Sequence, residues 1–338
     1  MASARPPLLE VEDLYVRFYT RDGVVRAVNG AGFHLRGGET LGLVGESGCG
    51  KSVISLSIMG LIPQPPGRIE RGAIRLGGLD LLELTSAQMQ RIRGNEIAMI
   101  FQEPMTSLNP VLTIGFQIAE SLRLHQKLPN GEAWRQALKM LEMVRIPDAA
   151  RRLKNYPHQL SGGMRQRVMI AMALSCRPKV LIADEPTTAL DVTIQAQILT
   201  LMTQLKEKLG TAIIMITHDL GVISQMAQRV MVLYAGRPVE EAPVTELFLR
   251  PAHPYTRGLI ASIPRVRTGS EKAGQDRLAE IPGQVPDMRL EIRGCAFAPR
   301  CRYVATRCEE QAPPARQIGP GHWAACWETD RVRMNDQS

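Results

Sequence analysis

The sequence predicts an α/β fold with an antiparallel edge, because two kinds of segment alternate along its first 250 residues. Four short apolar runs lie within positions 38–45, 95–102, 179–186 and 211–219, each bounded by Gly, Pro or polar residues. Such runs are typical of largely parallel strands that are buried on both faces. The segments between them repeat apolar residues at helical spacing, so strands and helices together predict an α/β core.

The helices and the antiparallel segments follow from their own periodicities. Helical spacing is found in residues 86–94, 132–144, 164–175 and 194–209. Residues 8–18 alternate like an antiparallel strand, and residues 229–242 resemble a hairpin. Beyond this point Pro and Gly become frequent and the periodicity weakens. We therefore expect one domain over residues 1–250 and a smaller appended module over residues 251–338.

Composition and sequence patterns argue against a disordered, a secreted or a membrane-spanning chain. With 44% hydrophobic and 22% charged residues, the chain is an ordinary globular sequence in which disorder does not dominate. The N-terminus has no unbroken apolar segment of the kind that marks a secretory signal, and the longest apolar stretch is interrupted at Arg177, Pro178 and Lys179. We expect a cytoplasmic protein that does not span a membrane by itself. The net charge of +8 is interpreted as a dispersed surface excess.

The strongest motif is "GESGCGKS", which follows an apolar run and opens a helical segment. This is the context of a P-loop, in which glycines let backbone N–H groups surround phosphate oxygens at a helix N-terminus. Lys51 is expected to reach the β- and γ-phosphates, and Ser52 to bind Mg²⁺. The nucleotide-binding residues predicted here are Gly45, Glu46, Ser47, Gly48, Cys49, Gly50, Lys51 and Ser52.

A pair of acids follows the third apolar run, in "VLIADEP". Ligands of open α/β sheets bind at the carboxyl ends of the strands, where Asp184 and Glu185 emerge. Asp184 is suited to hold Mg²⁺ directly or through water, and Glu185 to orient or deprotonate a water that attacks the γ-phosphate. Adjacent acids at a strand end are more often solvated or capping residues, but the P-loop in the same chain favours the catalytic interpretation.

A second anion-binding element is "LSGGMRQR", in which Ser161, Gly162 and Gly163 precede a helical run. Here the sequence resembles the ATP-binding cassette ATPases, whose LSGGQ motif is matched with Met164 in place of the final Gln. The resemblance covers residues 8–250 and implies a helical subdomain at about 103–178.

Further motifs of that family occur in the expected order. The resemblance assigns Gln102 to the Q-loop, with a role in catalysis, Mg²⁺ and ATP binding, and His218 to the catalytic switch position. It assigns Asp191 to the D-loop and Phe18 to the aromatic position that stacks on adenine, although neighbouring Tyr19 competes for that role.

The same resemblance implies a composite active site. In this family two subunits pair head to tail, so that the P-loop of one and the LSGG segment of the other enclose each ATP. Half a site is expected to turn over slowly, because phosphoryl transfer depends on positioning and charge neutralisation. Since Glu185 and His218 are both present, the sequence predicts a site competent for ATP hydrolysis.

Cassette ATPases drive membrane transport but also serve in DNA repair, chromosome maintenance and ribosome-associated factors. The basic charge makes a nucleic-acid enzyme the main alternative. Against it, the interval between Gln102 and Leu160 is short and leaves no room for a coiled-coil insertion, and no basic patch carries interleaved aromatic residues. We therefore expect no nucleic-acid partner.

The tail narrows the class within the family. Residues 253–264 and the cysteine-containing stretch after Gly294 resemble the C-terminal extension of the oligopeptide and dipeptide importer ATPases. That resemblance implies a peripheral subunit on the cytoplasmic face of the membrane, with two permease subunits, an external solute-binding protein and a second, related ATPase as partners. Importers of this type carry peptides and, in some systems, nickel or another small solute; the sequence does not say which solute is carried.

Four of the six cysteines collect in the tail: Cys295, Cys301, Cys308 and Cys326. A disulfide framework is not expected in a cytoplasmic protein, and plain burial suits isolated cysteines better than a cluster. Four thiolates can hold a zinc ion or a [4Fe-4S] cluster, and the spacing alone does not separate the two. The resemblance favours [4Fe-4S], with zinc and no metal as alternatives, and we expect a mainly structural role, with redox sensing as the other possibility.

Overall fold

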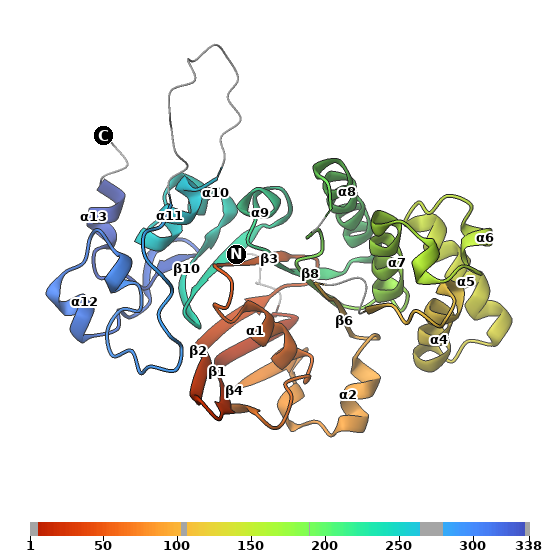
Figure 1. Cartoon of the computed structure of the whole chain (residues 1–338), viewed down its shortest axis with the longest axis horizontal. Helices are drawn as coiled ribbons and strands as arrows, with labels where there is room; N and C mark the ends of the chain where they lie inside the picture. The colour runs from red at the N-terminus through yellow and green to blue at the C-terminus, as the bar shows by residue number, and fades with distance from the viewer. Residues whose placement is uncertain (1–5, 103–106, 189, 264–279, 335–338) are drawn as a thin grey trace, which may run out of the picture.

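The structure of the protein is a computed structural model that describes residues 6–102, 107–188, 190–263 and 280–334 (Figure 1). Part of the predicted helical subdomain, residues 103–106, and the alanine of the "TTALD" segment lie outside the described residues. The strands are β1 (Leu9–Thr20), β2 (Gly23–Leu35), β3 (Thr40–Val44), β4 (Gly67–Leu76), β5 (Leu79–Asp80), β6 (Ile97–Ile100), β7 (Val180–Asp184), β8 (Ala212–Ile216), β9 (Arg229–Tyr234), β10 (Arg237–Pro243), β11 (Arg316–Gly319) and β12 (His322–Ala324).

Helices surround these strands, and short 3-10 turns punctuate the chain at η1 (Leu81–Glu83), η2 (Pro157–Gln159) and η3 (Ala298–Arg300). The helices are α1 (Lys51–Ile58), α2 (Ser86–Ile92), α4 (Ile114–Gln126), α5 (Asn130–Met143), α6 (Ala149–Arg152), α7 (Gly162–Leu174), α8 (Val192–Leu209), α9 (Leu220–Met226), α10 (Val244–Leu249), α11 (Pro254–Ala261), α12 (Thr306–Glu310) and α13 (Thr329–Met334). Within the described part of the chain, no helix combines the length and apolar character that crossing a bilayer requires.

The larger sheet of the described residues has the strand order β11-β12-β10-β9-β3-β8-β7-β6. The stretch from β9 to β6 is parallel, and every residue of β3, β7 and β8 is buried. The four short apolar runs of the sequence are the parallel strands β3, β6, β7 and β8, as predicted. Helices on both faces explain why these strands carry no alternation of polar residues.

The N-terminal strands form a separate antiparallel sheet in the order β2-β1-β4-β5 (Figure 1). Leu14 and Val16 of β1 point into its core, while Tyr15 and Arg17 alternate to the other face. This sheet confirms the antiparallel edge expected from residues 8–18. Strands β2 and β4, which pair with β1, are not predicted from the sequence, because their apolar and polar residues alternate without a clear period.

A helical part built from α4, α5, α6 and α7 lies beyond β6, the edge strand of the larger sheet (Figure 1). Thr113 caps α4 by accepting a hydrogen bond from the Phe116 N–H. Gly115 lets α4 approach its neighbours closely, since a Cβ there would lie 2.9 Å from the carbonyl of Leu153. Helix α4 was not predicted from the sequence.

The C-terminal residues join the main sheet. Strand β12 pairs antiparallel with β10, so that Glu240 lies opposite Ala324 and Glu241 opposite Trp323, and β11 pairs with β12. The periodicity of the C-terminal sequence is therefore too weak to predict β11 and β12, although both strands extend the sheet. The domain boundary at residue 250 stays a prediction, because strand pairing continues across it.

A buried carboxylate joins the extension to β10. Glu240 is inaccessible to solvent and accepts hydrogen bonds from the backbone N–H groups of Ala252 (2.7 Å) and His253 (2.9 Å). Its Oε1 also lies 2.8 Å from Nε2 of His322, which is buried on β12. A buried carboxylate is tolerated where several donors satisfy it, so this network fixes the start of α11 and the β12 strand together.

We predict that Glu240→Ala destabilises the fold by about 3 kcal/mol, because it leaves several buried donors without an acceptor. The midpoint of urea unfolding measures the change, and limited proteolysis should show earlier cleavage of the C-terminal extension. Glu246→Ala is the control, since the Glu246 side chain is partly exposed and lies 3.9 Å from that of Arg250. Equal stability losses in the two variants would contradict this role of Glu240.

Candidate functional site

The loop between β3 and α1 has the backbone that the P-loop motif requires. Gly45 has φ 154°, and a Cβ there would lie 2.3 Å from the carbonyl oxygen of Leu233. Gly50 has φ 101°, and its Cβ would lie 2.4 Å from the carbonyl oxygen of Ala27. At Gly48, by contrast, a Cβ would meet none of the described atoms within 4 Å. The loop is therefore packed on its inner side and open on the side where N–H groups can surround an anion.

The ammonium group of Lys51 lies within this loop. Its ammonium donates hydrogen bonds to the carbonyl oxygens of Gly45 (2.7 Å) and Glu46 (3.0 Å), and it lies 3.7 Å from the sulfur of Cys49. Burial raises the pKa of the Cys49 thiol more than the nearby ammonium lowers it, so that the thiol stays protonated at neutral pH. The cation at the site is thus Lys51, with Cys49 as a packed neighbour.

Asp184 and Ser52 bring a carboxylate and a hydroxyl group together beside the loop. Asp184 is buried at the end of β7, and burial raises its pKa, while a hydrogen bond with the Ser52 side chain works in the opposite direction. Carboxylate and hydroxyl oxygens are the donors that Mg²⁺ prefers, so the residues fit that ion. A bound divalent cation would also favour the charged form of Asp184, which burial disfavours.

Glu185 stands at the centre of a polar cluster. Its Oε1 lies 3.1 Å from Nδ1 of His218, while its Oε2 accepts from Thr188 Oγ1 (2.9 Å) and from Gln102 Nε2 (3.3 Å). Burial alone would raise the pKa of Glu185, but the hydrogen bonds from His218 and Thr188 and the charge of Lys51 together lower it. The side chain is therefore an ionised carboxylate at neutral pH, which can accept a hydrogen bond or a proton from water.

The backbone of Glu185 is unusual for a residue with a side chain. It has φ 48°, in the left-handed region, and its N–H donates to the carbonyl of Ile216 on β8 (2.8 Å). Residues in this region carry strain and persist where the surroundings hold them. The turn after β7 thereby brings Glu185 toward His218, which follows β8.

Other predicted residues lie outside this cluster. Ser161 caps α7 by accepting from the Met164 N–H (3.4 Å), and Asp191 caps α8 by accepting from the Ile194 N–H (2.9 Å). Both caps are exposed, and Gly163 packs close to Ile194, so the two helix starts lie side by side. Phe18 packs near Gly67 at the end of the N-terminal sheet. A partner that covers this surface would meet Ser161 and Asp191 together.

Three residues that contact predicted site residues are not predicted from the sequence. Thr188 holds Glu185, while Tyr255 and Arg300 both contact Glu46 of the loop. Thr188 lies within the "TTALD" segment, so its closeness to Glu185 in sequence was a usable signal. Arg300 lies 254 residues from Glu46, and no sequence pattern connects the two.

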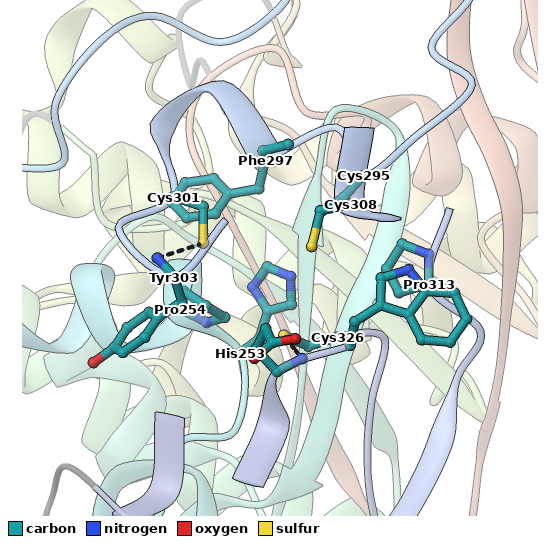
Figure 2. Close-up of a pocket in the computed structure, with 12 residues that line it drawn as sticks. His253, Pro254, Cys295, Phe297, Cys301, Tyr303, Cys308, Pro313 and Cys326 are labelled. Atoms are coloured by element: carbon teal, nitrogen blue, oxygen red, sulfur yellow. Dashed lines mark hydrogen bonds between the residues drawn. The ribbon is translucent and has the colours of Figure 1, made fainter. Parts of the chain in front are cut away.

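The four tail cysteines line one cavity (Figure 2). All six cysteines lie within the described residues, and all are free thiols. His253, Phe297 and Tyr303 complete the walls together with Trp327 and nearby prolines. Figure 2 shows the side chains of Cys301, Cys308 and Cys326 around the ring of His253. Residues from separate segments of the tail therefore converge at one place.

Three thiols of this cavity, those of Cys295, Cys301 and Cys326, are held in their neutral form by burial. Burial raises the pKa of Cys295 and Cys301, and it raises that of Cys326 to about 12. Backbone N–H groups nevertheless point at two sulfurs, from Tyr303 to Cys301 (3.3 Å) and from Glu328 to Cys326 (3.4 Å). Among the described residues, no three His, Cys, Asp or Glu side chains are grouped closely enough to hold a metal ion. Hydrogen-bond donors aimed at sulfur suit thiolates, which would form when a cationic group binds.

Two family models match the chain in succession. The model described as ABC transporter matches residues 28–188, which include the P-loop and the acids after β7. The model described as oligopeptide/dipeptide transporter, C-terminal region, matches residues 239–308, which include three of the four tail cysteines.

Relatives of similar length match almost the whole chain. The probable peptide ABC transporter ATP-binding protein y4tR of Sinorhizobium fredii is 56% identical over 325 residues, which cover 96% of each chain. The oligopeptide transport ATP-binding protein OppD of Bacillus subtilis is 52% identical over 320 residues, which cover 95% of this chain and 88% of the relative.

A solved structure has the same core fold. The dimeric ATP-binding cassette MJ0796, in a post-hydrolysis state with ADP and Pi, superimposes with a TM-score of 0.63 at 26% identity. The match covers 70% of this chain and 98% of that one, so the remaining residues of this chain have no counterpart there.

Proposed function

The chain belongs to the ATP-binding cassette transporter family, and on that premise we propose that it is the ATP-binding subunit of a peptide importer. The observation that carries the proposal is the full-length similarity to peptide-transport ATP-binding proteins, which includes the C-terminal region and is not limited to the cassette. The solute itself is chosen by other subunits, so di- and oligopeptides are proposed as a class.

The reaction is hydrolysis of ATP to ADP and phosphate. The loop of residues 45–52 would bind the phosphates, with Lys51 moving from the loop carbonyls to the β- and γ-phosphates. Mg²⁺, held by Ser52, Asp184 and Gln102, would neutralise phosphate charge when bound. Glu185 would orient the attacking water or accept its proton, and His218 and Gln102 would position Glu185 and the γ-phosphate.

The nucleotide site is proposed to be composite. Ser161 and Gly162 are exposed at the start of α7, and together with Gly163 they would serve the ATP of the opposite subunit. Asp191 beside them would face the partner across the same interface. Phe18 would stack on adenine after leaving its present contact near Gly67.

We propose that the opposite subunit is a second, related ATPase, and that both subunits sit on two permease subunits at the cytoplasmic face of the membrane. An external solute-binding protein would deliver the peptide. Energy from ATP would reach the permeases through the helical part around α4 and α5. Exposed apolar side chains there, Val111 and Leu124, suit such a contact.

We also propose that Cys295, Cys301, Cys308 and Cys326 hold a [4Fe-4S] cluster. Their convergence on one cavity supports a shared ligand, since four cysteines are the usual ligand set of such a cluster. Four sulfurs around a single zinc would lie about 3.8 Å apart, given a Zn–S bond of about 2.3 Å. No such grouping is found among the described side chains, so the proposal rests on the convergence of the four cysteines on one cavity. The cluster would cross-link separate segments of the tail, as small modules often require.

Glu185→Gln is predicted to lower ATP hydrolysis by the assembled transporter at least about 100-fold, because general-base catalysis is lost. The Kd for MgATP should stay within about threefold of wild type, since the amide keeps a similar shape. Phosphate release, measured with and without peptide-loaded binding protein, tests both claims. Glu207→Gln, an exposed change on α8, is the control. Wild-type turnover in Glu185→Gln would contradict the assignment, and peptide-independent wild-type turnover would contradict the peptide importer.

Purification of the tagged chain from membranes tests the proposed partners. We expect it to bring two permease subunits and one copy of a different ATPase, with the stoichiometry measured by native mass spectrometry. A stable, active transporter that contains two copies of this chain and no second ATPase would overturn the proposed pair.

Anaerobic purification of the full chain should give a brown protein with about four irons and about four acid-labile sulfides. Replacing any of the four tail cysteines with Ser should reduce both contents, whereas Cys176→Ser should leave them unchanged. Cys176 is buried elsewhere, beside Ser175 and the carbonyl of Ser121. A colourless protein with one zinc per chain would contradict the cluster.

A further inference from the structure

An acidic residue occupies the second position of the phosphate-binding loop. Glu46 lies between Gly45 and Ser47, and its own carbonyl accepts a hydrogen bond from the Lys51 ammonium (3.0 Å). A carboxylate here stands close to where a triphosphate with several negative charges would bind. Like charges at short range in a partly buried site oppose binding, so this carboxylate has to be neutralised or turned away.

The carboxylate of Glu46 is paired with a cation from the tail. Arg300 donates from Nη1 to Oε2 (2.7 Å) and from Nη2 to Oε1 (3.0 Å), in the forked geometry that suits a carboxylate. The Arg300 side chain is 4% exposed and that of Glu46 28%. Water therefore screens this ion pair far less than a surface pair.

Arg300 is itself held firmly. Its remaining donors reach the carbonyl oxygens of Pro282 (2.8 Å) and Ile281 (3.2 Å) and the hydroxyl of Tyr234 (3.3 Å). It ends η3, directly before Cys301, and packs near the ring of Phe297. These contacts fix where the guanidinium stands, so the guanidinium determines where the Glu46 carboxylate points.

A second contact from the tail fixes the backbone at the same position. The hydroxyl of Tyr255, on α11, accepts a hydrogen bond from the Glu46 N–H (2.8 Å). The Tyr255 ring is buried and lies 4.6 Å from that of Tyr234 and 5.5 Å from that of Phe297. Both the backbone and the side chain of Glu46 are thus held by residues from the C-terminal half of the chain.

We propose that Arg300 is a positioning residue of the nucleotide site, which neutralises the Glu46 carboxylate and keeps it away from the phosphates and from Lys51. The inference rests on the proposed function, since it concerns the affinity of the same loop for ATP. Without Arg300, the freed carboxylate would repel the triphosphate and compete with it for the Lys51 ammonium. The tail would then contribute to ATP binding without touching the nucleotide.

A double-mutant cycle on the full chain tests this. Arg300→Gln should raise the Kd for MgATP about tenfold, and less in high salt, because the defect is electrostatic. Glu46→Gln in the same chain removes the unpaired charge and should restore the Kd to within about threefold of wild type. Arg302→Met is the matched control, since Arg302 stacks on Tyr303 in the same segment and should leave the Kd unchanged. Melting temperatures of all variants report on folding.

The outcomes distinguish a failure of the proposed function from a failure of the role of Arg300. A wild-type chain that does not bind MgATP would defeat the proposed function itself. If wild type binds, then an unchanged Kd in Arg300→Gln, or a double variant as weak as Arg300→Gln alone, overturns the role of Arg300. Should Arg300→Gln not fold, the double variant decides: a Kd near wild type supports the proposal, and about tenfold weaker binding overturns it.

Discussion

The parallel pairing of β3, β7 and β8 is the constraint on which the rest of the site depends. Asp184 pairs with Ile216 and Leu43 also pairs with Ile216, so the three strands end at the same edge of the sheet. The loop after β3, the acids after β7 and the histidine after β8 must then meet there. The complete burial of these strands makes a shift of register costly, because it would move polar ends into the core.

At this edge of the sheet, each of the two acidic side chains has its own polar partners. Glu185 is kept ionised by His218 and Thr188, whereas Asp184 is buried beside Ser52 in an environment that suits a bound cation. Two neighbouring carboxylates thus have opposite pKa shifts because their surroundings differ. Under the proposed function, Glu185 would accept a hydrogen bond from water and Asp184 would bind metal, although they are adjacent in sequence.

The tail is part of this arrangement and also of the fold. Strands β12 and β11 extend the main sheet, and the aromatic rings of Tyr234, Tyr255 and Phe297 pack between the sheet and the cysteine cavity. A small, proline-rich region of this kind buries little apolar surface of its own. Its order therefore depends on the sheet it joins and on the buried Glu240 network.

The sequence by itself determined the parallel strands, the main helices around them and the residue types of the nucleotide site, because buried strands and glycine-rich loops leave local patterns. Local pattern also singled out the four tail cysteines as a set. Tertiary structure alone decided which distant residues meet: Arg300 with Glu46, His322 with Glu240, and β12 with β10. These contacts join segments of weak periodicity across long stretches of chain, and the complementarity of charge and hydrogen bonding that selects them exists only once the chain is folded.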